Sequence, residues 1–95
     1  MTRKERNTFV PPVVYPPGDT LREWIDERGI SKKELAVRLG KLPKDVSRLL
    51  SGELSVTHDW ADRLSIVTGL SSDFWRRKQD AYDAYKRFKK LVSFR

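Results

Sequence analysis

Apolar residues recur every three or four positions from Gly18 to near the end of the chain, which is the spacing of helices that bury one face. Glycines interrupt this pattern at places where a helix would end in a left-handed residue. The pattern therefore predicts five helices joined by short loops. In chain order, the inward residues that we expect are Leu21, Trp24, Ile25, Leu35, Ala36, Leu39, Val46, Leu49, Leu50, Ala61, Leu64, Val67, Phe74, Trp75, Ala81, Tyr82, Tyr85, Phe88 and Val92.

Capping residues indicate where the helices begin. Ser31-Lys32-Lys33-Glu34 matches a capping box, in which the serine hydroxyl bonds the backbone three residues later, so the second helix should run from Ser31 to Leu39. Pro43 suits the first turn of a third helix that ends near Ser51, because that turn needs no backbone donor. The caps expected for the fourth and fifth helices are Thr57 and then Ser71 or Ser72.

The first 17 residues carry a different pattern. They contain all but one of the five prolines, interleaved with valines and a tyrosine. Because proline fixes φ and lacks a backbone N–H, this segment should form an extended arm. Two interpretations stay open: a strap packed on its own domain, or an arm exchanged with a second subunit or a protein partner. The residues concerned are Val10, Pro11, Pro12, Val13, Val14, Tyr15, Pro16 and Pro17.

Composition excludes several classes of function. A chain of 95 residues with 38% hydrophobic residues and three tryptophans can build one modest core, so we expect a single domain. The lack of cysteine excludes disulfides and thiolate metal sites, and the one histidine cannot form a histidine metal cluster. The apolar runs are too short for a membrane span or a signal peptide. We therefore expect no cofactor, no contact with a membrane and a cytoplasmic location.

The net charge of +7 suggests a polyanionic partner, and the distribution of charge along the chain indicates which segments would contact it. Residues 1–18 carry +2 and residues 73–95 carry +5, whereas residues 19–72 are neutral. Inside the neutral stretch, residues 31–51 carry six bases and two acids, and the first predicted helix is acidic. Positive charge is thus concentrated on the second and third predicted helices, as well as at the two ends of the chain.

The second and third predicted helices have the lengths and the glycine-containing turn of a helix-turn-helix. In that motif the first helix of the pair crosses the phosphate backbone of DNA, and the second enters the major groove. Ala36 is small where the two helices must approach closely, and Gly40 stands in the turn. Val46 is the apolar anchor of the second helix of the pair.

Residues off the buried stripe of the third predicted helix should meet base edges. Arg48 is the sharpest candidate, because a guanidinium can bond guanine O6 and N7 together, although it could instead clamp a phosphate. Asp45 can accept only from cytosine N4 or orient a neighbouring base, and Leu42 could touch a thymine methyl or pack into the turn. The predicted base-reading residues are Leu42, Pro43, Lys44, Asp45, Ser47 and Arg48.

Phosphates should be bound near the start of the second predicted helix. Free backbone N–H groups and the positive end of the helix dipole attract anions there, and Lys32 and Lys33 add charge. Such contacts position a protein without specifying a sequence, and lysines that serve only solubility are the alternative. The predicted phosphate-binding residues are Ser31, Lys32, Lys33, Lys41 and Ser51.

Several of these segments together match a known family. They are Pro17-Gly18-Asp19 with Leu21, Gly29-Ile30-Ser31 with Glu34-Leu35-Ala36, Leu39-Gly40, Val46-Ser47-Arg48-Leu49-Leu50-Ser51-Gly52, Val56-Thr57, and Gly69 with Ser71 and Asp73-Phe74-Trp75. Over about residues 16–85 the chain resembles the HigA-type antitoxins of the Xre helix-turn-helix family. The resemblance implies a homodimer that represses its own operon at a palindromic operator. It also implies that the protein binds and blocks a RelE-like ribonuclease toxin encoded beside it.

The last predicted helix carries more aromatic surface than four short helices can cover, which indicates an interface. Phe74 and Trp75 should complete the core of the same chain, whereas Tyr82, Tyr85 and Phe88 are candidates for a dimer or partner interface. The predicted fold class is therefore all-α, a five-helix domain like that of lambda repressor. We assign an extended Pro-rich arm to residues 1–17, and a helix-turn-helix domain with a long C-terminal dimerisation helix to residues 18–95.

Alternative functions remain to be separated from an antitoxin that binds double-stranded DNA. One is a phage or plasmid autorepressor without a toxin partner. Another is a basic protein that binds single-stranded RNA, because aromatic rings interleaved with bases can stack on single strands. The residues that suggest it are Tyr82, Tyr85 and Phe88 among Lys86, Arg87, Lys89 and Lys90. We do not expect an enzyme, because His58 stands beside Asp59 without a nucleophile at a recognisable spacing.

Overall fold

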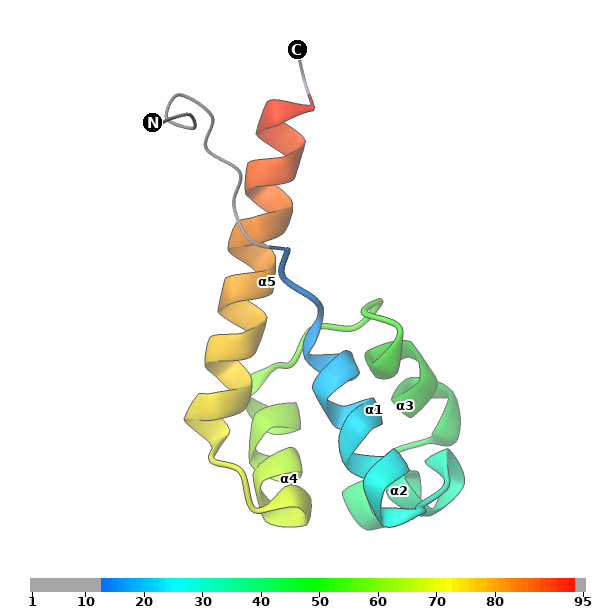
Figure 1. The fold of residues 1–95 in the computed structure, drawn as a ribbon. Helices are drawn as coiled ribbons and strands as arrows, with labels where there is room; N and C mark the ends of the chain where they lie inside the picture. The colour runs from blue at the N-terminus through cyan, green and yellow to red at the C-terminus, as the bar shows by residue number, and fades with distance from the viewer. Residues whose placement is uncertain (1–12, 94–95) are drawn as a thin grey trace, which may run out of the picture.

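The computed structural model describes residues 13–93, which form five α-helices joined by short loops (Figure 1). No β-strand occurs within this range, so the predicted all-α class is confirmed. The part of the predicted arm over residues 1–12 lies outside the described residues. The helices are α1 (Pro17–Arg28), α2 (Lys32–Leu39), α3 (Pro43–Leu50), α4 (His58–Thr68) and α5 (Ser72–Val92).

Local capping groups explain why the helices begin and end where the sequence pattern predicts. The hydroxyls of Ser31, Thr57 and Ser71 each accept a hydrogen bond from the backbone amide three residues later, at 3.0, 3.3 and 3.0 Å. Of the two serines considered for α5, Ser71 is therefore the cap. The helices α1, α2 and α4 are closed by residues in the left-handed conformation, Gly29, Gly40 and Gly69.

Two local predictions need correction. Helix α1 begins at Pro17, one residue inside the segment predicted as the arm, because a proline at the first helical position sacrifices no hydrogen bond. The capping box at Ser31 is half formed. The Glu34 carboxylate accepts from Nη2 of Arg38 at 2.8 Å, one turn further along α2, in place of the Ser31 amide.

A single core holds the five helices together. Trp75 of α5 is fully buried, and Phe74 and Trp24 pack partly exposed against the same core. Two residues of α5 that were predicted to face inward, Ala81 and Val92, are exposed. They are exposed because α5 runs past the other helices (Figure 1). The buried apolar residues are Leu21, Ile25, Leu35, Ala36, Leu39, Val46, Leu49, Leu50, Val56, Trp60, Ala61, Leu64 and Trp75.

Close contacts of the backbone set the position of the second and third helices. Helix α1 approaches α3 at Gly18, where a Cβ would lie only 2.6 Å from the carbonyl oxygen of Leu49. Arg63 of α4 donates from Nη1 to the carbonyl oxygen of Leu39 at 2.8 Å, which satisfies one of the free carbonyls at the end of α2.

Within residues 13–93, none of the helices combines the length and the apolar character that crossing a membrane requires.

Candidate nucleic-acid interface

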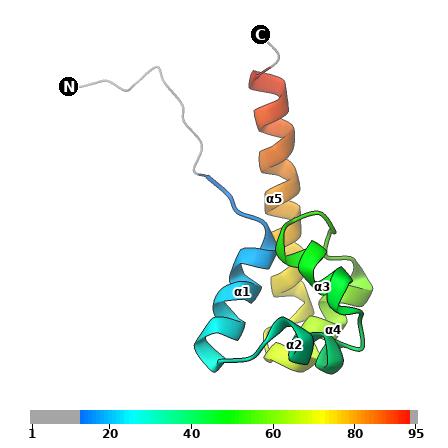
Figure 2. The same ribbon diagram turned by 90° about the vertical axis from the view of Figure 1, so that its right-hand side faces the viewer.

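Helix α3 buries one face and exposes the other. Val46, Leu49 and Leu50 are in the core. The exposed residues around the opposite face are Leu42, Pro43, Lys44, Ser47, Arg48 and Ser51, and Asp45 is half-buried beside them. Figure 2 shows α2 and α3 on the side that faces the viewer, with α5 behind them. The residues predicted to read bases therefore lie on one accessible helix rather than under other parts of the described chain.

Leu42 resolves one of the alternatives left open by the sequence. Its side chain is 63% exposed, so it does not pack into the turn between α2 and α3. It caps α3 from an extended backbone conformation, directly before Pro43. An apolar side chain at this position is available to contact a thymine methyl group.

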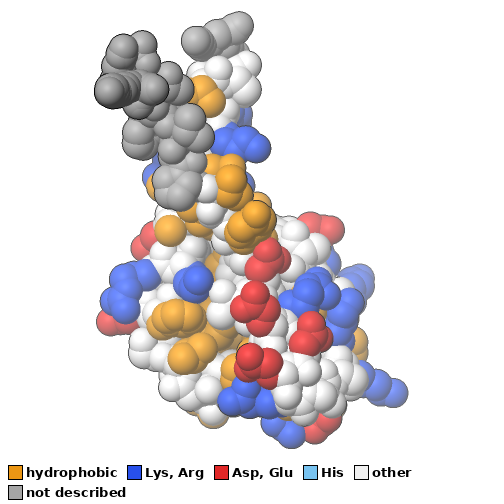
Figure 3. All heavy atoms as spheres, viewed as in Figure 1, with side chains coloured by type: hydrophobic (Ala, Val, Ile, Leu, Met, Phe, Trp, Pro, Cys, Tyr) orange, Lys and Arg blue, Asp and Glu red, His pale blue; other side chains and the backbone are white. Residues whose placement is uncertain are grey.

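The start of α2 is a second exposed basic feature. Ser31, Lys32 and Lys33 are all exposed, and Ser31 is the N-cap. The first backbone N–H groups of a helix and its positive dipole end favour an anion. In the view of Figure 3, acidic side chains lie over α1, and basic side chains lie on both the right-hand and the left-hand edge of the molecule. The acidic character expected for the first helix is thus visible on this surface.

Lys41, predicted to bind phosphate, already contacts the rest of the domain. Its Nζ lies 3.0 Å from Oδ2 of Asp59 and 4.8 Å from the centre of the Trp60 ring. Arg63 donates from Nε to the same Asp59 carboxylate at 3.0 and 3.1 Å. Hydrogen bonds from Lys41 and then Arg63 lower the pKa of Asp59 below its ordinary value. These contacts tie the turn between α2 and α3 to α4, and a phosphate contact by Lys41 stays a prediction.

Arg48, the strongest candidate for base reading, has a carboxylate beside it. Its Nε donates to Oε1 of Glu53 at 3.4 Å, and both side chains are exposed, at 47% and 65%. The Ser51 hydroxyl donates to the carbonyl oxygen of Arg48 at 3.0 Å, so Ser51 also helps to end the helix. Of the five N–H groups of this guanidinium, Glu53 uses one, and the remaining groups are directed to no other residue between 13 and 93.

Sequence reasoning did not find the polar contact that anchors the loop after α3. Gln79 of α5 is 3% exposed, and its Oε1 accepts from the Val56 amide at 2.7 Å while its Nε2 donates to Asp83 Oδ1 at 2.9 Å. The guanidinium of Arg76 donates to the Val56 carbonyl oxygen. The available signal was spacing, because Gln79 lies one helical turn after the buried Trp75.

The interface candidates on α5 are half-buried within their own chain. The Tyr82 hydroxyl lies 3.7 Å from the position that a Cβ on Gly52 would take, so this ring packs toward the loop after α3. Lys86 and Lys89 lie over the rings of Tyr82 and Tyr85, with Nζ 4.7 and 5.7 Å from the ring centres. An interface at Tyr82, Tyr85 and Phe88 stays a prediction.

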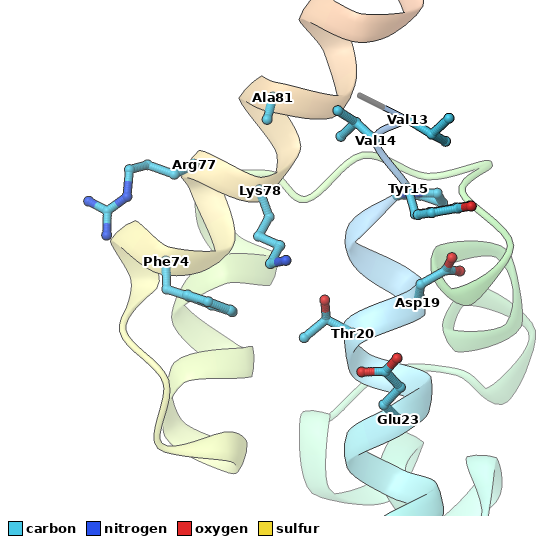
Figure 4. Close-up of a pocket in the computed structure, with 11 residues that line it drawn as sticks. Val13, Val14, Tyr15, Asp19, Thr20, Glu23, Phe74, Arg77, Lys78 and Ala81 are labelled. Atoms are coloured by element: carbon cyan, nitrogen blue, oxygen red, sulfur yellow. The ribbon is translucent and has the colours of Figure 1, made fainter. Parts of the chain in front are cut away.

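An open groove of about 710 Å³ separates the described part of the arm and α1 from α5 (Figure 4). Phe74 and Lys78 of α5 point toward α1, whereas Arg77 points away. Val13 and Tyr15 are 59% and 64% exposed, so the described arm residues leave much of their apolar surface uncovered.

The described residues form no group of three or more His, Asp or Glu side chains that could hold a metal ion.

These features define the class of helix-turn-helix proteins, with an exposed second helix supported by a five-helix core. No family model matches the chain. It is 38% identical over 66 residues, 70% of each chain, to YddM of Escherichia coli strain K12, an uncharacterised HTH-type transcriptional regulator. An addiction module antidote protein of the HigA family from Coxiella burnetii is 34% identical, with a TM-score of 0.76 over 83% of this chain and 87% of that one. The chain therefore belongs to the HigA family of helix-turn-helix antitoxins.

The antitoxin HigA of Pseudomonas aeruginosa, solved with the higBA promoter, is 29% identical, with a TM-score of 0.72 over 82% of this chain and 89% of that one. These relatives are a transcriptional regulator and antitoxins, which are not enzymes. The predicted family, fold and absence of an enzymatic role are in agreement with these findings.

Proposed function

We propose that this chain is an antitoxin that binds double-stranded DNA through the outward face of α3 and represses the operon that encodes it. The observation that carries the proposal is the division of α3 into a buried apolar face and an exposed face that bears Lys44, Ser47 and Arg48. The promoter complex of the Pseudomonas aeruginosa relative supports DNA as the ligand. A cytoplasmic location follows from the proposal, because the operator would lie on cytoplasmic DNA.

On this proposal, the two exposed basic features of the helix-turn-helix divide the work. Ser31, Lys32 and Lys33 would bind phosphates and fix the register. The residues that would read base edges in the major groove are Leu42, Pro43, Lys44, Asp45, Ser47 and Arg48. Lys41 and Ser51 would contribute from the turn and from the end of α3. A footprint on the DNA upstream of the gene tests this proposal. Protection of an inverted repeat supports it, and uniform weak protection of all sequences contradicts it.

Arg48→Ala tests the assignment of the main base reader. A guanidinium that bonds guanine O6 and N7 supplies about 1–3 kcal/mol of discrimination, so the variant should lose preference among operator sequences more than it loses non-specific affinity. Equilibrium binding to the footprinted site and to scrambled duplexes measures both quantities. An equal loss on all duplexes would assign Arg48 to a phosphate instead.

We also propose that the repressor is a homodimer that uses the aromatic part of α5. Two copies related by a two-fold axis would set their α3 helices about 34 Å apart, to match two half-sites of a palindrome. Sedimentation equilibrium tests this directly, with Tyr85→Asp expected to give monomers and Arg87→Asp, on the exposed side of the same helix, expected to remain dimeric. A monomeric wild-type protein at micromolar concentration would contradict the proposal.

A RelE-like ribonuclease toxin is the protein partner that we propose. The proposal is supported by the HigA-family antidote protein to which the chain is similar. Co-expression with the neighbouring reading frame and purification through a tag on that product is the test. A stable stoichiometric complex that blocks RNA cleavage supports the antitoxin role. A repressor that binds its operator but captures no product of the neighbouring gene would be the phage or plasmid autorepressor considered above.

A further inference from the structure

Helix α3 ends in a motif that fixes the residue after its last glycine. Gly52 has a φ of +88°, its amide donates to the Leu49 carbonyl at 3.1 Å, and the Glu53 amide donates to the Arg48 carbonyl at 2.9 Å. This pair of bonds is a Schellman motif, in which the fifth residue after a helical position returns to lie beside it. The backbone itself therefore brings Glu53 next to Arg48.

The same motif elsewhere in the chain has a different pair of side chains. At the end of α1, the Ile30 amide donates to the Ile25 carbonyl at 3.0 Å, and these two apolar residues pack against the core. An apolar pair is the common companion of this motif. At the end of α3, the equivalent pair is Arg48 and Glu53, which forms an ion pair on the surface instead. The second residue of the pair is also charged at the end of α2, where the Lys41 amide donates to the Ala36 carbonyl at 3.0 Å. At the end of α3, this charged residue is Glu53, and it lies beside Arg48.

The loop that holds Glu53 is anchored on both sides. A Cβ on Gly52 would lie 3.3 Å from the ring of Pro16, so this glycine packs closely on the chain entering α1. Three residues after Glu53, the buried Val56 is held through its amide by Gln79 and through its carbonyl by Arg76. The Glu53 side chain remains 65% exposed while its backbone is fixed. The fixed backbone therefore keeps the exposed carboxylate of Glu53 beside Arg48.

We propose that Glu53 is a positioning residue that determines how Arg48 reads DNA, an inference that rests on the proposed function. Its carboxylate accepts the Nε–H of Arg48, which leaves the two terminal nitrogens as a fork. That fork matches the paired acceptors O6 and N7 of guanine. The negative charge beside it disfavours a phosphate as the alternative ligand, because a carboxylate and a phosphate repel each other. The specificity of Arg48 for a G·C pair is thus set by a residue outside α3.

The test compares variants of Glu53 on the footprinted operator and on duplexes with single base-pair changes. The relevant base pair is the one whose discrimination is lost in Arg48→Ala. Glu53→Ala should lower the preference for that pair by about threefold to fivefold, the range available to an exposed ion pair. It should also raise affinity for all duplexes, because a negative charge is removed near phosphates. Thermal unfolding of each variant checks that the domain is intact.

Three controls separate positioning from a change in charge. Glu53→Gln loses the charge but keeps an oxygen that accepts from Nε, so it should keep most of the preference. Glu34→Ala removes the partner of Arg38 on α2 and should leave the preference unchanged. In the Arg48→Ala background, Glu53→Ala should lower the preference no further, because the group it positions is gone.

The possible failures are distinguishable. If Arg48→Ala loses discrimination at one base pair while Glu53→Ala keeps it in full, the positioning role is wrong and the proposed function stands. The same conclusion follows if Glu53→Gln and Glu53→Ala lose preference equally, since charge alone would then explain the effect. If the wild-type protein prefers no duplex over another, the proposed function fails, and the role of Glu53 fails with it.

Discussion

Single side chains decide what the exposed surface of the helix-turn-helix contacts. Arg48 carries the most information, because its guanidinium is exposed and bonded only through Nε among the described residues. Lys32 and Lys33 lie in the first turn of α2, where the helix dipole adds to their charge. Lys41 differs, since its charge is already opposed by Asp59. Substitution of Lys32 or Lys33 should therefore affect DNA binding, whereas substitution of Lys41 should also remove a contact with α4.

Lys32→Ala and Lys33→Ala should each reduce the salt dependence of DNA binding. Each phosphate contact releases about one counterion, so the slope of log affinity against log salt should become shallower by about one unit per variant. Fluorescence anisotropy over a series of salt concentrations measures the slope. Lys78→Ala, at the groove on α5, is the matched control and should leave the slope as it is. An unchanged slope in the α2 variants would remove them from the interface.

Asp59 should make the stability of the domain depend on pH. Its pKa in the folded protein is lowered by hydrogen bonds from Lys41 and then from Arg63, so the charged form is favoured by folding. This contribution is present above the ordinary value of 3.8 and is lost as the pH falls through the lowered pKa. Wild-type protein should therefore unfold at a higher temperature than Asp59→Asn at neutral pH, and this difference should shrink in acid. A difference that stays constant down to the lowest pH would show that Asp59 acts by another means.

At the scale of elements, the sequence predicts the helices better than the contacts between them. Spacing and caps are local, so Ser31, Thr57 and Ser71 mark the helix starts correctly. Contacts such as that of Gln79 with Val56 join residues 23 apart, and no periodic pattern encodes them. The pairing of Glu53 with Arg48 required the three-dimensional course of the chain around Gly52. The exposure of the residues predicted to read bases could therefore be predicted from the sequence, whereas the contacts of Glu53 and Gln79 around them could not.

Gly18→Ala should separate α1 from α3. A Cβ at this position would lie 2.6 Å from the Leu49 carbonyl oxygen, and backbone atoms cannot move aside as a flexible side chain can. Overpacking of this kind costs about 1–3 kcal/mol of stability. Urea denaturation measures the loss, and Arg22→Ala on the exposed side of α1 should change stability by less than about 0.5 kcal/mol. A stability equal to that of the wild type would contradict the close packing of α1 on α3.

Gln79→Leu should destabilise the anchor of the loop after α3. The substitution leaves the buried Val56 amide without its acceptor, which costs about 1–3 kcal/mol. Hydrogen exchange of the Val56 amide should become faster by more than the change in global stability, because the bond is lost locally. Arg87→Leu, on the exposed side of α5, provides the comparison. Equal protection of the Val56 amide in both variants would show that the bond contributes little.

At the scale of the whole molecule, two basic regions among the described residues are candidates for contact with nucleic acid. One is the surface of α2 and α3, and the other is the end of α5, where Lys86, Arg87, Lys89 and Lys90 stand near aromatic rings. The first region suits duplex DNA, whereas bases interleaved with aromatic rings are typical of single-strand binding. Which of them meets the nucleic acid is therefore the central question.

Backbone chemical shifts of the isotope-labelled protein, followed during titration with its operator duplex, test this most directly. Our account predicts that the largest changes fall on residues 42–51 and 31–33, with small changes at the end of α5. Single-stranded RNA of the same length should produce smaller changes at the same concentration. Changes confined to residues 86–92, with α3 unaffected by the duplex, would contradict the account.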